Sequence, residues 1–241
     1  MDQRLQTIVE NFDKMKLDLD EPFQFRCKQC GKCCVNREDI LLSPSDLFRI
    51  SKKLGLPVEE TFKQYCETYI GQDSKLPVVR LKPRGSIKRC PLLQDRKCVV
   101  HDAKPAVCAL FPLGRAVMLD AKEYATQGMA GQKTQYILQP VDCGAKDETH
   151  TVREWLGKFG LPAEDATFHK WQETIMDFST MFRAAQKKVP ESVLHPAWTL
   201  TLVALYLSYD IKKEFLPQLE ENVQKLKEAL TEVFMPEEGA E

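Results

Sequence analysis

The feature that most constrains this chain is the spacing of its cysteines near the N-terminal end. Cys27, Cys30, Cys33 and Cys34 follow a C-x2-C-x2-C-C pattern. Two residues between cysteines let the backbone curl until both sulfurs reach one ion, which is why this spacing recurs in zinc and iron–sulfur sites. Gly31 permits a positive φ in this turn, so backbone N–H groups can point at a sulfur. We therefore predict that this segment binds metal.

The adjacent pair Cys33 and Cys34 constrains the number of sites. Neighbouring side chains on an extended backbone point to opposite faces, so one ion takes both sulfurs only awkwardly. Either one of the pair serves a second metal, or the cluster is polynuclear. Four further cysteines bring the set to eight thiols, enough for two four-ligand sites. The predicted metal ligands are Cys27, Cys30, Cys33, Cys34, Cys90, Cys98, Cys108 and Cys143.

Other candidate ligands are weaker. Cys66 has no cysteine close to it in sequence and falls in a predicted helix, so we expect it to pack in the core. His101, three residues after Cys98, is either a ligand, a donor to a thiolate, or an exposed or hydrogen-bonded histidine outside the site, and the last is favoured. His169 is expected to be structural or exposed. The spacing gives His150 and His195 no partner.

A metal site is favoured over a disulfide framework by the expected compartment. The N-terminal residues contain no apolar core of a signal peptide, so we expect a cytoplasmic protein with reduced thiols. The count of nine cysteines is odd, and none follows Cys143. The most apolar stretch, Val193 to Tyr209, is short and includes His195 and Pro196, so no membrane association is expected.

The residue patterns predict an α+β fold that is mainly α. A small metal-pinned, cysteine-rich region with short strands would be followed by a helical C-terminal region. The expected boundaries are an N-terminal helix in residues 1–21, a cysteine-cluster metal-binding domain in residues 22–145 and the helical region in residues 146–241. Leucines and aromatics at helical spacing in the last region are expected to form its core.

Capping residues and turn formers place individual elements. Ser43 as N-cap, Pro44 at the first helical position and Gly55 at the end predict a helix between them. Thr151 with Glu154 predicts a capping box. Further helices are expected over residues 5–15, 57–69, 162–187, 196–209 and 218–234. Strands are expected over residues 78–82, 116–119 and 136–138, with a hairpin over 90–100 that turns near residue 95.

Charge is unevenly distributed. Residues 22–110 contain 17 Lys or Arg against 9 Asp or Glu, a balance of +8, whereas the whole chain has a net charge of -1. Eight thiolates with two divalent ions would reduce this to +4, since 8 - 8 + 4 = 4. The basic run VRLKPRGSIKR before Cys90 could dock an acidic partner or phosphate, but its position favours neutralisation of thiolates. Nucleic acid is therefore a disfavoured partner, and a protein partner is expected.

The two cysteine segments resemble a known family. FRCKQCGKCC and CPLLQDRKCVVHDAKPAVCALFP are similar to the YkgJ-type cysteine-cluster family, described as a zinc- or iron-chelating domain. The resemblance spans roughly residues 23–145, and the matching positions are Phe25 through Cys34, Asp46, Cys90, Leu92, Cys98, Pro105, Cys108, Phe111 and Pro112. It departs from the usual pattern at His101, Lys104 and Ala109, which leaves the sulfurs intact and places any shared role of those flanking side chains in doubt.

Three functions are compatible with these observations. The first is a zinc-stabilised module that presents a binding surface. The second is an iron–sulfur protein that supports redox or protein-modification chemistry, which is implied because this cluster also occurs in flagellin lysine-N-methylases. The third is a nucleic-acid-binding zinc module. All-thiolate sites suit both zinc and iron–sulfur clusters. No glycine-rich nucleotide loop or nucleophile elbow is visible, so catalytic residues and enzymatic activity are left undecided.

Overall fold

The computed structural model describes residues 10–118 and 121–234, which form an α+β fold of two compact units. Unit 1 contains the residues up to 33 together with 95–97 and 106–165. Unit 2 contains residues 34–94 and 98–105 and continues from residue 166. Each unit is therefore assembled from segments that lie far apart in the sequence. The predicted fold class, with short strands in small sheets and a helical C-terminal region, is confirmed.

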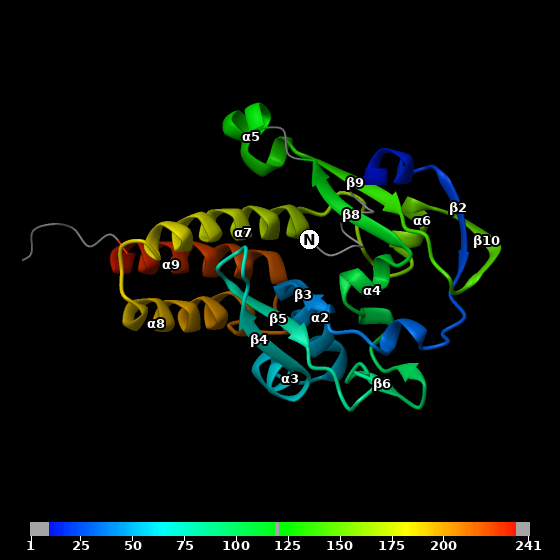
Figure 1. The fold of residues 1–241 in the computed structure, drawn as a ribbon, viewed down its shortest axis with the longest axis horizontal. Coiled ribbons are helices and arrows are strands. Elements are labelled where there is room, and N and C mark those ends of the chain that lie inside the picture. Colours follow the sequence, from blue (N-terminus) through cyan, green and yellow to red (C-terminus); the bar gives the residue numbers. More distant parts are fainter. Residues whose placement is uncertain (1–9, 119–120, 235–241) are drawn as a thin grey trace, which may run out of the picture. The chain divides into compact units, whose positions relative to one another are not determined.

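Unit 1 is built on two small antiparallel sheets (Figure 1). The first has the order β1-β9-β8, and the second pairs β10 with β2. The strands are β1 (Lys16–Leu17), β2 (Pro22–Arg26), β8 (Leu113–Met118), β9 (Lys133–Leu138) and β10 (Ala145–Thr151). The helical elements are η1 (Lys32–Cys34, ending one residue inside unit 2), α4 (Ala106–Leu110), α5 (Ala121–Gln127), η3 (Gly128–Gly131) and α6 (Val152–Gly157).

The core of unit 1 forms around Trp155. Phe23 and Phe25 alternate on β2 and are both buried, so they project from the same face of the strand. Their rings meet the Trp155 ring edge to face, with centroids 5.9 and 5.6 Å apart. The Trp155 indole N–H donates to the carbonyl oxygens of Ala109 and Leu110 at 3.2 and 3.1 Å. The core thus fixes β2, α4 and α6 relative to one another.

In its described residues, unit 2 combines a three-stranded sheet with five α-helices. Figure 1 shows this sheet and the helices. The sheet has the antiparallel order β3-β5-β4, and α8 packs on its central strand. The strands of this sheet are β3 (Leu41–Leu42), β4 (Cys66–Ile70) and β5 (Pro77–Leu81). A separate hairpin pairs β6 (Leu93–Gln94) with β7 (Lys97–Cys98), and its residues 95–97 are assigned to unit 1. The helical elements are α2 (Pro44–Leu54), α3 (Val58–Tyr65), η2 (His101–Ala103), α7 (Ala166–Ala185), α8 (Glu191–Leu202), the π-helix η4 (Val203–Leu207) and α9 (Phe215–Phe234).

The limits of α2 follow directly from its capping residues. The Ser43 hydroxyl accepts from the Asp46 backbone N–H at 3.2 Å, and the Asp46 carboxylate accepts from the Ser43 N–H at 3.0 Å. Gly55 ends the helix in the left-handed region, with a φ of 67°. These contacts confirm the predicted N-cap and C-cap. The capping box of Thr151 and Glu154 at the start of α6 is confirmed in the same way.

The helices of unit 2 bury the predicted aromatic and leucine stripes. Phe178 and Phe182 of α7 are buried, as are Leu219, Leu226 and Leu230 of α9. The rings of Phe182 and Phe234 meet edge to face at 5.2 Å, which joins α7 to α9. The prediction that these residues form a core is confirmed. Val233, near the end of α9, is 44% exposed and is not part of this core.

The helix predicted over residues 57–69 is too long. Helix α3 ends at Tyr65, and residues 66–70 form β4, which pairs antiparallel with β5. No glycine or proline separates the helix from the strand. The sequence therefore gives no clear sign of where the helical period of apolar residues changes to the two-residue period of a strand. Residues 66–70 form a strand because residue types alternate along CETYI and because β5 pairs with it.

The segment after Cys143 also differs from its prediction. Residues 145–151 form β10 rather than part of a helical region. This strand is polar and largely exposed, so it lacks the apolar alternation by which a strand is recognised. It forms because β2 offers it a pairing edge.

Two predictions concern the ends of the chain and the membrane. Of the N-terminal helix predicted in residues 1–21, residues 10–15 are helical and residues 1–9 lie outside the described residues. Residues 16–21 are not helical, because Lys16–Leu17 form β1, which pairs with β9, and a turn follows. Across the described ranges, no helix combines the length and the apolar character needed to span a bilayer.

Candidate metal centre

The C-x2-C-x2-C-C segment leaves β2 in a tight irregular turn. Cys27 directly follows the strand, and Cys33 and Cys34 lie in the short helix η1. Gln29 and Gly31 have positive φ values of 49° and 72°, as the tight turn requires. The Gln29 backbone N–H donates to Cys27 Sγ across 3.4 Å. The predicted positive φ at Gly31 is therefore confirmed, and a backbone donor does approach a sulfur in this turn.

Cys143 reaches the same turn through the pairing of β2 with β10. The two strands are antiparallel, and Arg26 at the end of β2 lies opposite Ala145 at the start of β10. The residues just beyond this pair, Cys27 and Cys143, consequently lie at the same end of the sheet. Gly144 makes the close approach possible, because an added Cβ would lie 2.4 Å from Cε2 of the Phe25 ring. Its φ of 81° also favours glycine.

The electrostatic surroundings of Cys143 show which thiols are its neighbours. Partial burial raises the pKa of the Cys143 thiol above its ordinary value. Nearby acidic groups raise this pKa further: Cys30, Cys33, Asp142 and Cys27. A bound cation would oppose both effects on Cys143, because it stabilises the ionised form of a thiol. Four of the eight predicted ligands are thus brought together within unit 1.

An ion pair connects the two segments that carry these cysteines. Lys32, between Cys30 and Cys33, donates from Nζ to a carboxylate oxygen of Asp142 at 2.5 Å. This hydrogen bond raises the pKa of Lys32 and lowers that of Asp142. The pair is exposed, so its contribution to stability is small. Cysteine spacing alone did not predict this ion pair, although the opposite charges of Lys32 and Asp142 beside cysteines are visible in the sequence.

Three more of the predicted ligands belong to unit 2. The Cys90 backbone N–H donates to the Cys34 carbonyl oxygen at 2.8 Å, which places these two residues side by side. The Leu93 N–H donates to the Cys90 carbonyl oxygen, and β6 and β7 then carry the chain to Cys98. Asp95 and Arg96 turn the hairpin with φ values of 45° and 63°. The predicted hairpin is confirmed.

The boundary between the units coincides with the pair of adjacent cysteines. Cys33 belongs to unit 1 and Cys34 to unit 2, so the boundary falls at the peptide bond between them. Cys108, the eighth predicted ligand, lies on α4 in unit 1, next to the buried Ala109 and Leu110.

The thiols approach one another without forming a closed coordination sphere. None of the nine cysteines, all of which are described, forms a disulfide. In the described ranges, no three His, Cys, Asp or Glu side chains are close enough to one another to hold an ion as they stand. The donor set of Cys27, Cys30, Cys33 and Cys143 nevertheless fits a soft metal, because thiolates are the ligands of structural zinc and of iron–sulfur clusters.

Asp46 and Arg49 support the segment that follows Cys98. The buried Asp46 carboxylate accepts from Arg49 at 2.8 Å, and Arg49 also donates to the Lys104 carbonyl oxygen at 3.2 Å. Because Asp46 also caps α2, its contacts account for a buried acid without a metal. The neighbouring His101 lies in η2, where burial and the charge of Lys104 lower its pKa.

The other histidines have contacts that are compatible with packing. His150 is buried in unit 1, with its ring centroid 5.2 Å from that of Trp155. His195 packs edge to face on Trp198 at 5.4 Å, and His169 lies on α7 next to the Phe168 ring.

Cys66 is buried in the protein interior. It begins β4, opposite Leu81 of β5, and is 6% exposed. Burial raises the pKa of the Cys66 thiol to about 12, from an ordinary value of 9.0. The thiol is therefore neutral at physiological pH and unsuited to metal binding or nucleophilic attack. Its environment agrees with the predicted role in core packing, although it lies in a strand rather than a helix.

This burial predicts a specific dependence of stability on pH. Below about pH 9 the Cys66 thiol is protonated in both the folded and the unfolded chain. Between about pH 9 and 12 the unfolded chain releases this proton while the folded chain retains it, so the free energy of unfolding should fall by about 1.4 kcal/mol per pH unit. Urea unfolding of the wild type and of the matched Cys66→Ala variant, followed against pH, isolates this contribution. Equal slopes for the two proteins would show that Cys66 ionises freely in the folded state.

Comparison with known protein families supports a metal site formed by these cysteines. A family model described as "CxxCxxCC: Putative zinc- or iron-chelating domain" matches residues 26–144. Residues 26–144 are thus similar to the CxxCxxCC family. The match begins at the end of β2, ends at Gly144, and includes all nine cysteines. The predicted family is thus confirmed, and with it the zinc- or iron-chelating character of the CxxCxxCC domain.

A curated relative and the solved structures add little about function. The chain is 28% identical over 90 residues to the uncharacterized protein MJ0661 of Methanocaldococcus jannaschii. That alignment covers 36% of this chain and 44% of the relative, so the chain matches less than half of the relative's length. No solved structure matches the chain.

Proposed function

We propose that the eight cysteines outside β4 bind zinc or an iron–sulfur centre as thiolates, and that the protein acts as a metal-stabilised interaction module. The observation that carries this proposal is the pairing of β2 with β10, which brings Cys143 to the strand end that leads into Cys27, within the residues that match the chelating-domain family model. The cysteines Cys27, Cys30 and Cys33 also contribute to the raised pKa of Cys143, after its burial. Cys143 is more than a hundred residues away from these three in the sequence. The pairing of β2 with β10 and the glycine at position 144 serve to bring it there.

The chemistry of the site favours metal over a thiol cluster alone. Four thiols in one place repel one another as they ionise, and a divalent cation or an iron–sulfur core replaces this repulsion with attraction. Metal binding would stabilise the folded turn after β2. The unfolded chain has no preformed site, so the free energy of metal binding favours the folded state. Cys34, Cys90 and Cys98 provide the thiols of a second group in unit 2. A metal bound by four thiolates would have no open coordination position, as in structural zinc sites.

An iron–sulfur protein is the second candidate, and one contact favours it. The Gln29 N–H donates to Cys27 Sγ, and hydrogen bonds to sulfur are a principal means by which proteins set the potential of such clusters. An iron–sulfur centre would direct the proposal to redox or protein-modification chemistry.

Elemental analysis with a visible spectrum tests both candidates on protein purified without oxygen. We expect either about two zinc ions per chain and no colour, or about four iron atoms with matching sulfide and absorbance near ~400 nm. The first result supports the structural module, and the second supports the iron–sulfur alternative. Fully reduced protein that carries neither metal, and takes up none when reconstituted, would overturn the proposal.

A further inference from the structure

The basic run before Cys90 forms an ordered hairpin in unit 2. Arg84 and Arg89 exchange two backbone hydrogen bonds of 2.8 Å, and the loop between them turns with positive φ at Gly85 and Lys88. The tip is also anchored, because the Asn36 N–H donates to the Ile87 carbonyl oxygen at 2.9 Å. We call residues 82–89 the basic hairpin. Its side chains are thus displayed from a fixed backbone rather than from a loose loop.

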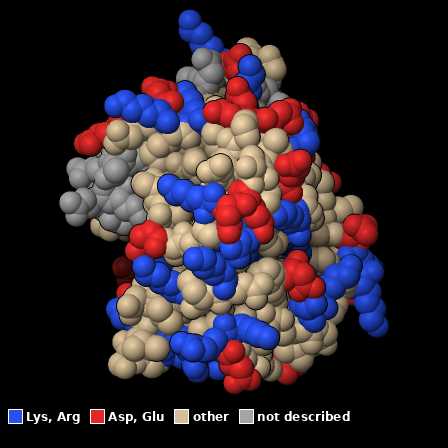
Figure 2. Space-filling model, turned by 90° about the vertical axis from the view of Figure 1, so that its right-hand side faces the viewer, with Lys and Arg blue, Asp and Glu red and all other residues tan. Residues whose placement is uncertain are grey.

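The charges of the basic hairpin are exposed and only partly paired. Residues 80–90 include five Lys or Arg and no Asp or Glu. Lys88 pairs with Glu38 at 2.7 Å. Lys82 and Arg89 are exposed and make no ion pair with any residue in the described part of the chain. Figure 2 shows Lys and Arg side chains gathered on the lower part of the face it presents. Lys82 and Arg89 are therefore available to form ion pairs with an anionic partner.

An apolar side chain lies at the tip of the same hairpin. Ile87 is 56% exposed, the largest value among the exposed large hydrophobic residues. It lies between the turn residue Ser86 and the charged pair Lys88 and Arg89. A branched apolar side chain bordered by cations suits a partner that offers an apolar pocket with carboxylates around it.

We infer that the basic hairpin docks an acidic segment of a partner protein, with Ile87 packed against apolar side chains of that segment and Lys82 and Arg89 paired with its carboxylates. This inference rests on the proposed interaction module and names its surface and the chemistry of its partner. The position of the basic hairpin before Cys90 favours a role in neutralising thiolates. Because its side chains are exposed, they can also bind a partner.

The ring contacts favour protein over single-stranded nucleic acid as the partner. Single-stranded nucleic acid binds by stacking bases on exposed aromatic rings. The Tyr65 ring is covered by the Arg84 guanidinium at 5.9 Å, and the Tyr69 ring by that of Arg80 at 5.3 Å. Arg80 is further held by Glu67 at 2.7 Å. Each of these two rings therefore has one face covered by a guanidinium, and the side chain at the tip of the hairpin is aliphatic.

The test uses full-length, metal-loaded protein and three fluorescein-labelled probes. These are an acidic peptide of four Glu-Glu-Leu repeats, a basic peptide of four Lys-Lys-Leu repeats and a single-stranded RNA of twelve nucleotides. The acidic peptide should bind, and its affinity should fall about tenfold or more in the variant Lys82→Glu/Arg89→Glu and about tenfold in Ile87→Ser. The basic peptide should not bind.

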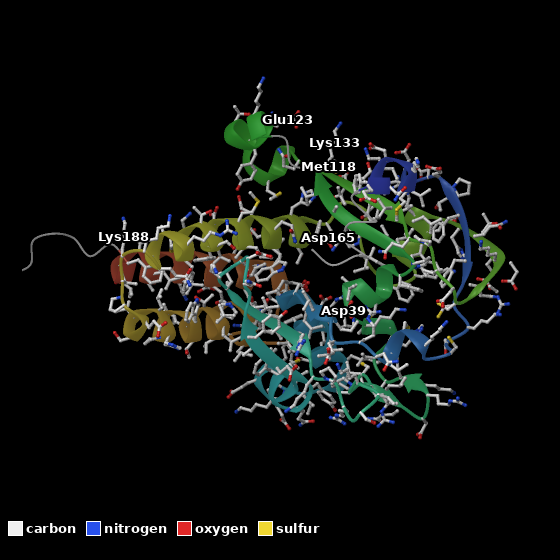
Figure 3. All side chains as sticks on the ribbon, in the orientation of Figure 1. Asp39, Met118, Glu123, Lys133, Asp165 and Lys188 are labelled. Carbon is white, nitrogen blue, oxygen red and sulfur yellow. The ribbon has the colours of Figure 1, made fainter. Side chains whose placement is uncertain are left out.

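A matched charge reversal controls for net charge. Lys187 and Lys188 lie just past the end of α7, also in unit 2, and both are exposed (Figure 3 labels Lys188). The variant Lys187→Glu/Lys188→Glu should bind the acidic peptide as the wild type does. Equal losses in both double variants would overturn the inference, because they would show attraction to net charge alone.

The remaining outcomes separate the inference from the proposed function. Metal-loaded wild type that binds no acidic peptide overturns the inference and leaves the metal site unaffected. RNA binding that is abolished by Lys82→Glu/Arg89→Glu, without peptide binding, overturns it in favour of nucleic acid. Specific peptide binding by protein that takes up no metal supports the inference and overturns the metal-stabilised module.

Discussion

Removal of the metal is expected to release the strand pair β2–β10 while the helices α7 and α9 stay folded. The pair is a two-stranded sheet, and such sheets are marginal in water without further support. Its end leads into Cys27 on one strand and Cys143 on the other, so a shared ion would join both strands. Structural zinc contributes about 10–16 kcal/mol in small finger peptides, which equals or exceeds the stability of a typical domain.

The helices of unit 2 provide the internal comparison. Helices α7 and α9 are joined by Phe182 and Phe234 and bury several leucines, so their packing does not depend on thiolates. Hydrogen exchange read by mass spectrometry, before and after chelation under reducing conditions, distinguishes the two regions. We expect amide protection in residues 22–26 and 145–151 to fall by a free energy on the order of 5 kcal/mol or more, and that of α7 and α9 to be retained.

The opposite pattern would remove the structural role of the metal. If β2 and β10 keep their protection in chelated, reduced protein, the aromatic core around Trp155 suffices to hold them. That core buries Phe23, Phe25 and Val152 as well, so this outcome has a definite physical meaning.

The elements that could be predicted from the sequence are those fixed by local contacts. Ser43, Asp46 and Gly55 define α2 because each acts within a few residues of its own position. Asp95 marks the hairpin for the same reason, because its side chain tolerates the left-handed turn. The aromatic stripe of α7 is similarly visible, because its period is that of the helix itself.

The elements that were missed depend on residues distant in sequence. Strand β10 is polar, so only its partner β2, more than a hundred residues earlier, makes it a strand. The same pairing places Cys143 beside Cys27, which spacing alone could not indicate. The partly buried pair of Arg115 and Asp165, joined at 2.9 Å in unit 1, could not be predicted for the same reason (Figure 3 labels Asp165). Spacing predicted that the eight cysteines bind metal, but only the fold indicates which of them are neighbours.

Replacement of single cysteines by serine is expected to divide the eight predicted ligands into groups. Cys30→Ser and Cys143→Ser should each remove the metal of one site, because both residues belong to the thiol group at the end of β2. Cys90→Ser should remove the metal of the other, whose thiols include Cys34 and Cys98. If the protein binds two zinc ions, each single replacement should lower the content by about one ion per chain. Cys66→Ser is the control and should retain all of the metal.

Double replacements make this division quantitative. Two changes in one site should remove no more metal than either alone, because effects within a shared site do not add. Cys30→Ser/Cys143→Ser should therefore keep about one ion, whereas Cys143→Ser/Cys90→Ser should keep none. Equal and complete loss in every single variant would instead indicate one polynuclear centre in which all the thiolates share the metal. Additive losses in Cys30→Ser/Cys143→Ser would contradict the grouping of these two residues, and with it the role assigned to the pairing of β2 with β10.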